Sequence, residues 1–220
     1  MKLAAVTFDV GGVIYSDEVF KRAIYSALEH YGAEITSDRF NRIYDAHLKS
    51  QNGSLRNKLC MEFFGSLELK SKMMEYATER WKFTDADLYQ DARDVIIEMK
   101  KRGLKIGLIA NQPATVVETL KAHGIYEYID FAGISSLIGI EKPSREIFEL
   151  ALEKLAVPAD QSLHIGNRID TDVIPAQSVG MRAVWIRRGE ANPSPSVEDL
   201  KIPDLVVDSL IGLPELIEAL

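Results

Sequence analysis

The feature that most constrains the fold is a regular alternation of short apolar runs with stretches of helical spacing. Residues 3–8, 105–110, 129–133, 162–166, 182–186 and 205–207 have the length and apolar character of buried strands. The segments between the later strands, residues 113–123, 143–156 and 171–179, together with 91–102 and 209–220, have the spacing and end signals of helices. Strands that alternate with helices pair in parallel through right-handed crossovers. The order therefore predicts an α/β fold with a Rossmann-like parallel sheet and helices on both faces.

One segment, residues 16–87, interrupts this alternation and contains no strand-like run. It carries four apolar stripes at helical spacing, which begin at Val19, Phe40, Leu55 and Leu69. Such a segment predicts a small four-helix bundle inserted after the first strand. We therefore expect an α/β core formed by residues 1–15 and 88–220 and a helical domain formed by residues 16–87. Asp17 and Glu18 are interpreted as caps of the first inserted helix.

Composition narrows the class of protein. The chain has 220 residues with 26 Lys and Arg against 33 Asp and Glu, a net charge of −7, which argues against a nucleic-acid partner. No apolar run approaches the ~20 residues of a membrane span, so no membrane partner is expected. Residues 1–6 show no cleavable signal pattern. The single cysteine, Cys60, excludes an intramolecular disulfide and favours a reducing compartment, so the cytoplasm is the expected location.

Polar residues follow the predicted strands where each one ends. Asp9 follows the first strand, Asn111 follows the second, Lys142 comes after the third, and residues 167–172 follow the fourth. Sites in open α/β sheets form at the carboxyl ends of the strands. The topology therefore gathers a carboxylate, an amide, a lysine and an acidic cluster at one edge of the sheet.

These segments resemble the motifs of the haloacid dehalogenase-like hydrolase superfamily, most of whose members are phosphatases. The segment FDVGGVI at residues 8–14 is the most specific match. Lys142-Pro143 followed by residues 146–148, and residues 166–172 leading to Gly180-Met181, are also characteristic. The resemblance covers nearly the whole chain, including the helical insert, which looks like the cap domain that closes over the substrate in this family.

The resemblance implies a role for each matching position. Asp9 would be the nucleophile that forms an aspartyl-phosphate, and Lys142 would neutralise the nucleophile and the phosphoryl oxygens. The substrate-binding residues would be Asn111, Gly12 and Arg168. Mg²⁺ would be held by Asp9, the Gly11 carbonyl, Asn167 and Asp172. The expected activity is a Mg²⁺-dependent phosphatase of a small phosphorylated metabolite.

Three positions depart from the usual phosphatase pattern. Gly11 stands where the family usually has an aspartate that acts as general acid and base, a role worth about 10²–10⁴-fold in rate. Ala110 replaces a hydroxyl residue that binds phosphate, and Asn167 replaces a carboxylate that ligates Mg²⁺. Asp170 lies close enough in sequence to compensate for Asn167. We therefore expect weakened catalysis, best on substrates with good leaving groups.

Two other functions remain open at this point. A metal-independent 2-haloacid dehalogenase uses the same aspartate and fits Gly11 and Asn167 loosely. A non-catalytic or regulatory binding protein on the same fold fits Asn167 together with Ala110. Among the basic residues of the helical insert, one is a candidate contact for a second anionic group on the substrate; the set is Arg39, Arg42, Lys49, Arg56 and Lys58.

Overall fold

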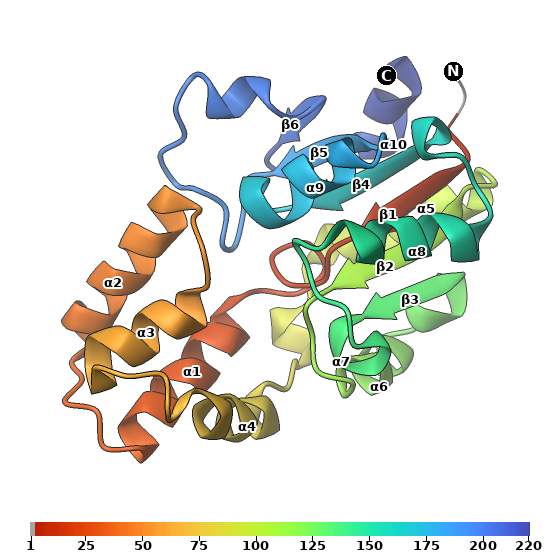
Figure 1. Ribbon diagram of the computed structural model, residues 1–220. Helices are drawn as coiled ribbons and strands as arrows, with labels where there is room; N and C mark the ends of the chain where they lie inside the picture. The colour runs from red at the N-terminus through yellow and green to blue at the C-terminus, as the bar shows by residue number, and fades with distance from the viewer. Residues whose placement is uncertain (1–2) are drawn as a thin grey trace.

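A parallel six-stranded sheet forms the centre of the molecule (Figure 1). The structure is a computed structural model that describes residues 3–220; Met1 and Lys2, which the predicted core includes, lie outside the described residues. The strand order is β3-β2-β1-β4-β5-β6, and every neighbouring pair is parallel. The strands are β1 (Ala5–Phe8), β2 (Lys105–Ala110), β3 (Phe131–Ile134), β4 (Ser162–Gly166), β5 (Arg182–Ile186) and β6 (Leu205–Val207). The predicted α/β class with a parallel sheet is confirmed.

Helices cover both faces of the sheet, and the side chains of each strand alternate between them. On one face lie α8 (Arg145–Leu155) and α9 (Ile174–Ser178), packed on Ile109 of β2 and Trp185 of β5. The other face carries α5 (Gln90–Lys101), α6 (Val116–Ala122) and α10 (Leu213–Leu216), packed on Leu108 and Val184. The sheet therefore separates two apolar layers, and its polar residues can be exposed only at the strand ends.

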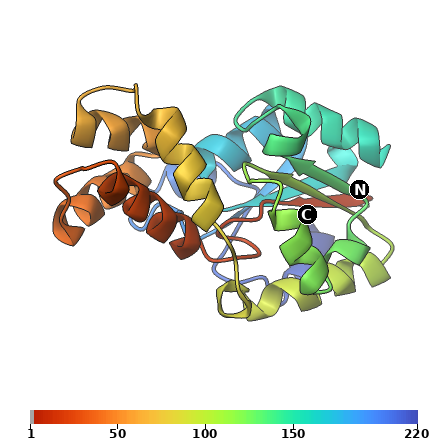
Figure 2. The same ribbon diagram turned by 90° about the horizontal axis from the view of Figure 1, so that it is seen from below.

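The helical insert lies to one side of the sheet in both views (Figures 1 and 2). It contains α1 (Glu18–His30), α2 (Ser37–Ser50), α3 (Leu55–Phe64) and α4 (Lys70–Arg80). The stripes predicted from the sequence are the buried faces of these helices; Ile24, Phe40, Leu59 and Met73 are at most 2% exposed. Thr36 and Ser54 cap α2 and α3 by accepting hydrogen bonds from backbone N–H groups three residues later. The apolar residues inside the insert form one continuous cluster with those on one face of the sheet.

Two adjacent linkers join the helical insert to the sheet. Ser16 N donates to the Asp87 carbonyl at 2.8 Å, and Tyr89 N donates to the Ile14 carbonyl at 3.0 Å. Tyr15 and Leu88 form an isolated antiparallel bridge between these two bonds. The chain thus enters and leaves the helical insert at neighbouring positions.

Several helices are shorter than the sequence pattern predicts. The segment predicted as a helix over residues 113–123 becomes helical only at Val116, and the final predicted helix is reduced to α10 and a 3₁₀ turn, Ile217–Ala219. Residues 171–179 are divided between a π-helical segment, Ile169–Val173, and α9. A four-residue helix, α7 (Ser135–Ile138), follows β3. No helix within residues 3–220 combines the length and the apolar character that crossing a membrane requires.

Candidate active site

A pocket of about 350 Å³ lies at the carboxyl ends of the central strands, between the sheet and the helical insert. The core contributes Asp9, Gly11, Asn111, Lys142, Asn167 and Arg168 to its wall, and the helical insert contributes Phe20, Leu55, Arg56 and Trp81. The residues predicted to share one edge of the sheet therefore do come together. Two of the predicted site residues, Gly12 and Asp172, do not line the pocket; they lie immediately behind its wall.

Lys142 forms ion pairs with two carboxylates of this site, the partly exposed Asp9 and the fully buried Asp172. Its Nζ lies 2.9 Å from Asp9 Oδ1 and 2.5 Å from Asp172 Oδ1. Asp9 Oδ1 also accepts a hydrogen bond from Val10 N at 2.7 Å, and Asp172 Oδ2 accepts one from Arg168 N at 2.9 Å. Asp9 is therefore held with one oxygen bonded, and no hydrogen bond from residues 3–220 reaches its other oxygen.

Burial and charge set the protonation states of Asp9, Asp172 and Lys142. Burial raises the pKa of Asp9 to about 6, with a further contribution from the Asp172 charge, while Lys142 acts in the opposite direction. Burial would also raise the pKa of Asp172, but Lys142 and His164 outweigh it and hold that pKa well below its usual range. Lys142 keeps a raised pKa because its two carboxylate partners outweigh the effect of burial. The site therefore holds Asp172 charged as the fixed partner of a charged Lys142.

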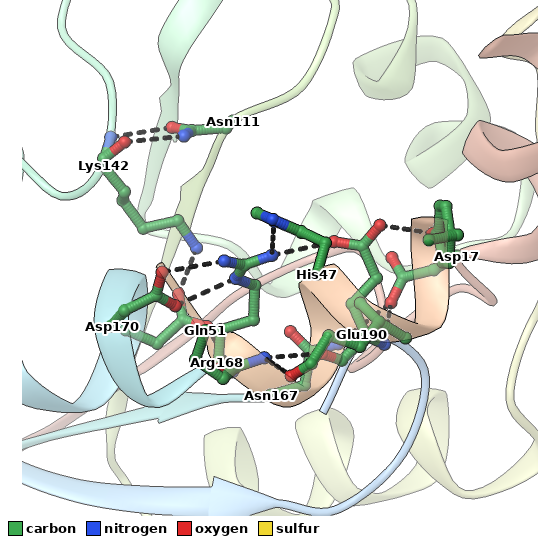
Figure 3. Close-up of polar contacts among 12 residues, drawn as sticks. Asp17, His47, Gln51, Asn111, Lys142, Asn167, Arg168, Asp170 and Glu190 are labelled. Atoms are coloured by element: carbon green, nitrogen blue, oxygen red, sulfur yellow. Dashed lines mark hydrogen bonds and ion pairs between the residues drawn. The ribbon is translucent and has the colours of Figure 1, made fainter. Parts of the chain in front are cut away.

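Asn111 pairs with the backbone of Lys142 (Figure 3). Its Nδ2 donates to the Lys142 carbonyl at 2.9 Å, and its Oδ1 accepts from Lys142 N at 2.8 Å. The side chain lines the pocket, as predicted, but its two bonds hold the lysine loop against the end of β2. Asn111 therefore positions Lys142, and only the second hydrogen of its amide remains for another acceptor.

Asn167 and Asp17 are hydrogen-bonded above the glycine turn that follows β1. Asn167 Nδ2 donates to Asp17 Oδ2 at 2.9 Å and to the Arg188 carbonyl at 3.2 Å. The Gly12 backbone has φ +67°, and a Cβ there would lie 1.8 Å from Asn167 Nδ2. Only glycine at this position allows Asn167 to lie so close to the turn.

Arg168 is occupied by contacts between the core and the helical insert (Figure 3). Its guanidinium donates to both oxygens of Asp170 at 3.0 and 2.8 Å, and its Nη1 lies 3.3 Å from His47 Nε2 and 3.6 Å from Glu190 Oε2. Gln51 of α2 adds a further contact, since its Oε1 accepts from Ile169 N. Arg168 lines the pocket but connects α2 to the loops after β4 and β5. Asp170 is its ion-pair partner.

Several residues of this site are absent from the sequence-based prediction. Asp17 is at the N-cap position of α1, as expected, but its side chain makes no capping bond and faces the pocket instead. Arg188 and Glu190 follow β5 at its carboxyl end. Applied to β5, the rule that sites form where parallel strands end (the strand-end rule) would have found them. Gln112, one residue after Asn111, also lines the pocket. Nothing in the local sequence around Asp17 distinguishes it from an ordinary helix cap.

Oxygen atoms that suit a hard divalent cation such as Mg²⁺ line the pocket, but not all of the expected ligands are among them. Asp172 is fully buried, both its oxygens are hydrogen-bonded, and it does not line the pocket. Within residues 3–220, no three His, Cys, Asp or Glu side chains gather closely enough to hold a metal alone. Asp9, Gly11 and Asn167 line the pocket, and a carboxylate with carbonyl oxygens is a donor set that Mg²⁺ accepts. These three would hold the ion.

Comparison with known proteins identifies related chains. A family model described as haloacid dehalogenase-like hydrolase matches residues 3–180. Glyceraldehyde 3-phosphate phosphatase of Methanopyrus kandleri is 31% identical over 128 residues, 58% of this chain and 55% of that protein. Phosphoserine phosphatase of Thermus thermophilus is 32% identical over 120 residues, 54% of this chain and 48% of that protein. The chain thus spans about half the length of these curated relatives.

A solved structure shares the fold. CbbY from Rhodobacter sphaeroides, determined in complex with phosphate, superposes with a TM-score of 0.75 at 20% identity, and the match covers 96% of each chain. At this level of identity the likeness concerns the arrangement of strands and helices.

Proposed function

Since this chain belongs to the haloacid dehalogenase-like hydrolase family, we propose that it is a phosphatase that hydrolyses small phosphate monoesters through Asp9. The observation that carries the proposal is the Asp9–Lys142 pair at the end of β1, with one Asp9 oxygen bonded and the other without a partner in the described chain. The related proteins named as phosphatases support it.

Two displacements at phosphorus complete the reaction. In the first, an Asp9 oxygen forms a bond to phosphorus while the bond from phosphorus to the ester oxygen breaks, giving an aspartyl-phosphate and an alkoxide or aryloxide, which takes a proton from water to become the alcohol. In the second, water attacks the same phosphorus, inorganic phosphate leaves and the Asp9 carboxylate is regenerated. Lys142 stabilises the negative charge on the transferring oxygens, since its ammonium already lies 2.9 Å from Asp9. Asp172 and Asn111 position that lysine.

A bound Mg²⁺ would neutralise charge on the phosphoryl group. Asp9, the Gly11 carbonyl and Asn167 would hold it, all of which line the pocket. Gly11 offers no proton to the departing alcohol, because it has no side chain. We therefore expect the highest rates with good leaving groups, which need little protonation.

We assign residues 16–87 as a cap domain and residues 1–15 and 88–220 as the catalytic core. The cap contributes the apolar side chains of Phe20, Leu55 and Trp81 to the pocket lining, and these suit the organic part of a small metabolite. Arg56 extends into the same pocket and makes no ion pair within residues 3–220. Arg39, Arg42, Lys49 and Lys58 do not line the pocket, which supports Arg56 as the contact for a second anionic group on the substrate. The cytoplasmic location stays a prediction.

The test is hydrolysis of an aryl phosphate with and without Mg²⁺. We expect metal-dependent turnover in the wild type, loss of at least about 10³-fold in Asp9→Asn, and no change in Asp94→Asn, an exposed acid on α5. Equal rates in wild type and Asp9→Asn would refute the proposal. Halide release from a 2-haloacid without metal would favour the dehalogenase alternative. Ligand binding without any turnover would favour the regulatory binding protein.

A further inference from the structure

We propose that Asp17 is a direct ligand of the divalent cation in this chain and supplies the negative charge that Asn167 lacks. The inference rests on the proposed function, which requires a cation beside Asp9. It concerns a residue that comes from the linker into the helical insert, eight positions after the nucleophile, and not from a strand end of the core.

The position of the Asp17 carboxylate is the first argument. A Cβ built on Gly11 would lie 2.5 Å from Asp17 Oδ1, and one built on Gly12 would lie 2.5 Å from Asp17 Oδ2. The carboxylate therefore occupies the space directly over the glycine turn, where a side chain at position 11 would otherwise extend. A glycine at position 11 and a carboxylate at position 17 are sterically complementary.

The orientation of Asp17 leaves one of its carboxylate oxygens available to a cation. Asp17 Oδ2 accepts from Asn167 Nδ2 at 2.9 Å and from Glu190 N at 2.8 Å. No hydrogen bond from residues 3–220 reaches Asp17 Oδ1, which faces Gly11. Because Asn167 uses its amide nitrogen for Asp17, its carbonyl oxygen is directed elsewhere and is likewise without a hydrogen bond from these residues. Figure 3 shows Asp17 beside Glu190 and close to Asn167.

The charge around Asp17 is the second argument. Asp9, Asp17 and Glu190 bring three carboxylates to this pocket, and no Lys, Arg or His side chain within residues 3–220 forms an ion pair with Asp17. Lys142 does not offset this negative charge, since it is paired with Asp9 and Asp172. Carboxylates crowded in a buried pocket without a matching cation are stabilised when a divalent ion binds.

An unsatisfied amide in the same place is an independent observation. Gln112 is 6% exposed and lines the pocket, yet its Oε1 has no hydrogen-bond partner among residues 3–220. Its Nε2 would lie 3.2 Å from a Cβ on Gly11, so the amide adjoins the space that Asp17 occupies. A buried carbonyl oxygen left unpaired is costly, and a cation or its bound water would satisfy it.

With Asp17 included, the charge of the ligands matches the charge of the divalent ion. Asp9 and Asp17 bring two negative charges, and Gly11 and Asn167 bring neutral carbonyl oxygens, with no contribution from Asp172. Two carboxylates with carbonyl oxygens suit Mg²⁺, which prefers hard oxygen ligands. Asn167 stands where a carboxylate is usual, and Asp17 from the helical insert supplies the missing negative charge. Asp170 does not supply it, because it is paired with Arg168.

The experiment is calorimetric titration of Mg²⁺ into the full chain without substrate. We expect Asp17→Asn to weaken Mg²⁺ binding at least about 10-fold, because one charged ligand is lost. Asp170→Asn removes the same charge from the same pocket and is expected to change the affinity by less than about 2-fold. Asn167→Asp is expected to restore binding when combined with Asp17→Asn. An unchanged affinity in Asp17→Asn, or an equal loss in both single variants, overturns the proposal.

A second readout covers a variant that folds poorly. We expect Mg²⁺ to raise the melting temperature of the wild type and of Asp170→Asn, and to have no such effect on Asp17→Asn at the same concentration. A wild type that binds no Mg²⁺ by either method also overturns the inference. Mg²⁺ binding that depends on Asp17 without any phosphate release would leave the inference standing while the proposed phosphatase function fails.

Discussion

Lys142 and Asp172 form an ion pair in which the lysine side chain is 3% exposed and the aspartate is fully buried. Asp172 lies behind the pocket wall, and its other oxygen is bound by Arg168 N. The lysine therefore has a fixed partner on the side away from Asp9. This arrangement keeps the ammonium charged and oriented whether or not a substrate is present.

Removing the lysine is expected to destabilise the protein strongly. Lys142→Met leaves the Asp172 carboxylate buried without its cation, and breaking such a pair costs about 3–5 kcal/mol. Urea denaturation measures the loss. Adding Asp172→Asn to Lys142→Met is expected to recover part of it, because the orphaned charge is gone. Lys154→Met, which removes an exposed lysine, is the control and is expected to change stability by less than about 0.5 kcal/mol. A Lys142→Met protein as stable as wild type would contradict this account.

Gly11 is expected to tolerate no side chain while Asp17 is present. A Cβ there would lie 2.5 Å from Asp17 Oδ1, and Asp17 cannot move away freely because Asn167 and Glu190 hold it. We expect Gly11→Ala to lower the free energy of unfolding by about 1–3 kcal/mol. The double variant Gly11→Ala with Asp17→Ala is expected to lose less stability than the sum of the losses in the two single variants, as measured by urea denaturation.

Restoring the usual family aspartate meets the same obstacle. Gly11→Asp places a second carboxylate against Asp17, so we expect it to lower activity toward alkyl and aryl phosphates alike. A gain in alkyl phosphate hydrolysis would show that Asp17 moves aside more easily than its two hydrogen bonds imply.

His47 is expected to make the protein less stable in acid. Burial, with the nearby charges of Arg168 and Lys58, lowers the pKa of His47 to about 4, whereas the unfolded chain binds a proton near pH 6.5. Between these values the unfolded state holds more protons, so the free energy of unfolding falls as the pH falls, by up to about 3 kcal/mol. Urea denaturation at pH 7 and pH 4.5 measures this slope. We expect His47→Gln to have a shallower slope, and an unchanged slope would rule out His47 as its source.

Arg188 is expected to hold the glycine turn in place. Its guanidinium donates to both oxygens of Asp91, at 2.9 and 2.8 Å, and to the carbonyls of Gly12 and Val13. A lysine cannot make these contacts together, so Arg188→Lys is expected to cost about 1–3 kcal/mol of stability and to raise the KM for phosphate esters. Arg187→Lys is the matched control: its pair with Asp208 is exposed, and we expect almost no effect. Equal losses in the two variants would contradict the anchoring role.

The sequence predicts the sheet well because burial dictates its pattern. The strands at residues 105–110, 162–166 and 182–186 are recovered with their bounds, since each is an apolar run bounded by turn residues. Helix ends are predicted less well. The final helix is only Leu213–Leu216 because Gly212, in the left-handed conformation, stands directly before it and excludes the preceding residues from the helix.

The candidate site is predictable where its residues follow strands and not where they come from the helical insert. Asp9, Asn111 and Lys142 obey the strand-end rule. Asp17 belongs to a linker, and its direction depends on how Asn167 and Glu190 fold over the glycine turn, which no local pattern encodes. Arg168 follows β4 and is predicted as a site residue, but its contacts are not. Its partner His47 lies 121 residues earlier in the chain, and its partner Glu190 lies in the loop after β5.

The pairing of the two linkers at Tyr15 and Leu88 has a consequence for the ancestry of such a chain. A segment whose ends are neighbours can be gained or lost without moving the strands on either side, because a short turn closes the gap at little entropic cost. Joining residue 16 directly to residue 87 through a few glycines is therefore expected to leave β1 and α5 in register. A helical segment can therefore be gained or lost at this point in a single genetic event without rearrangement of the sheet.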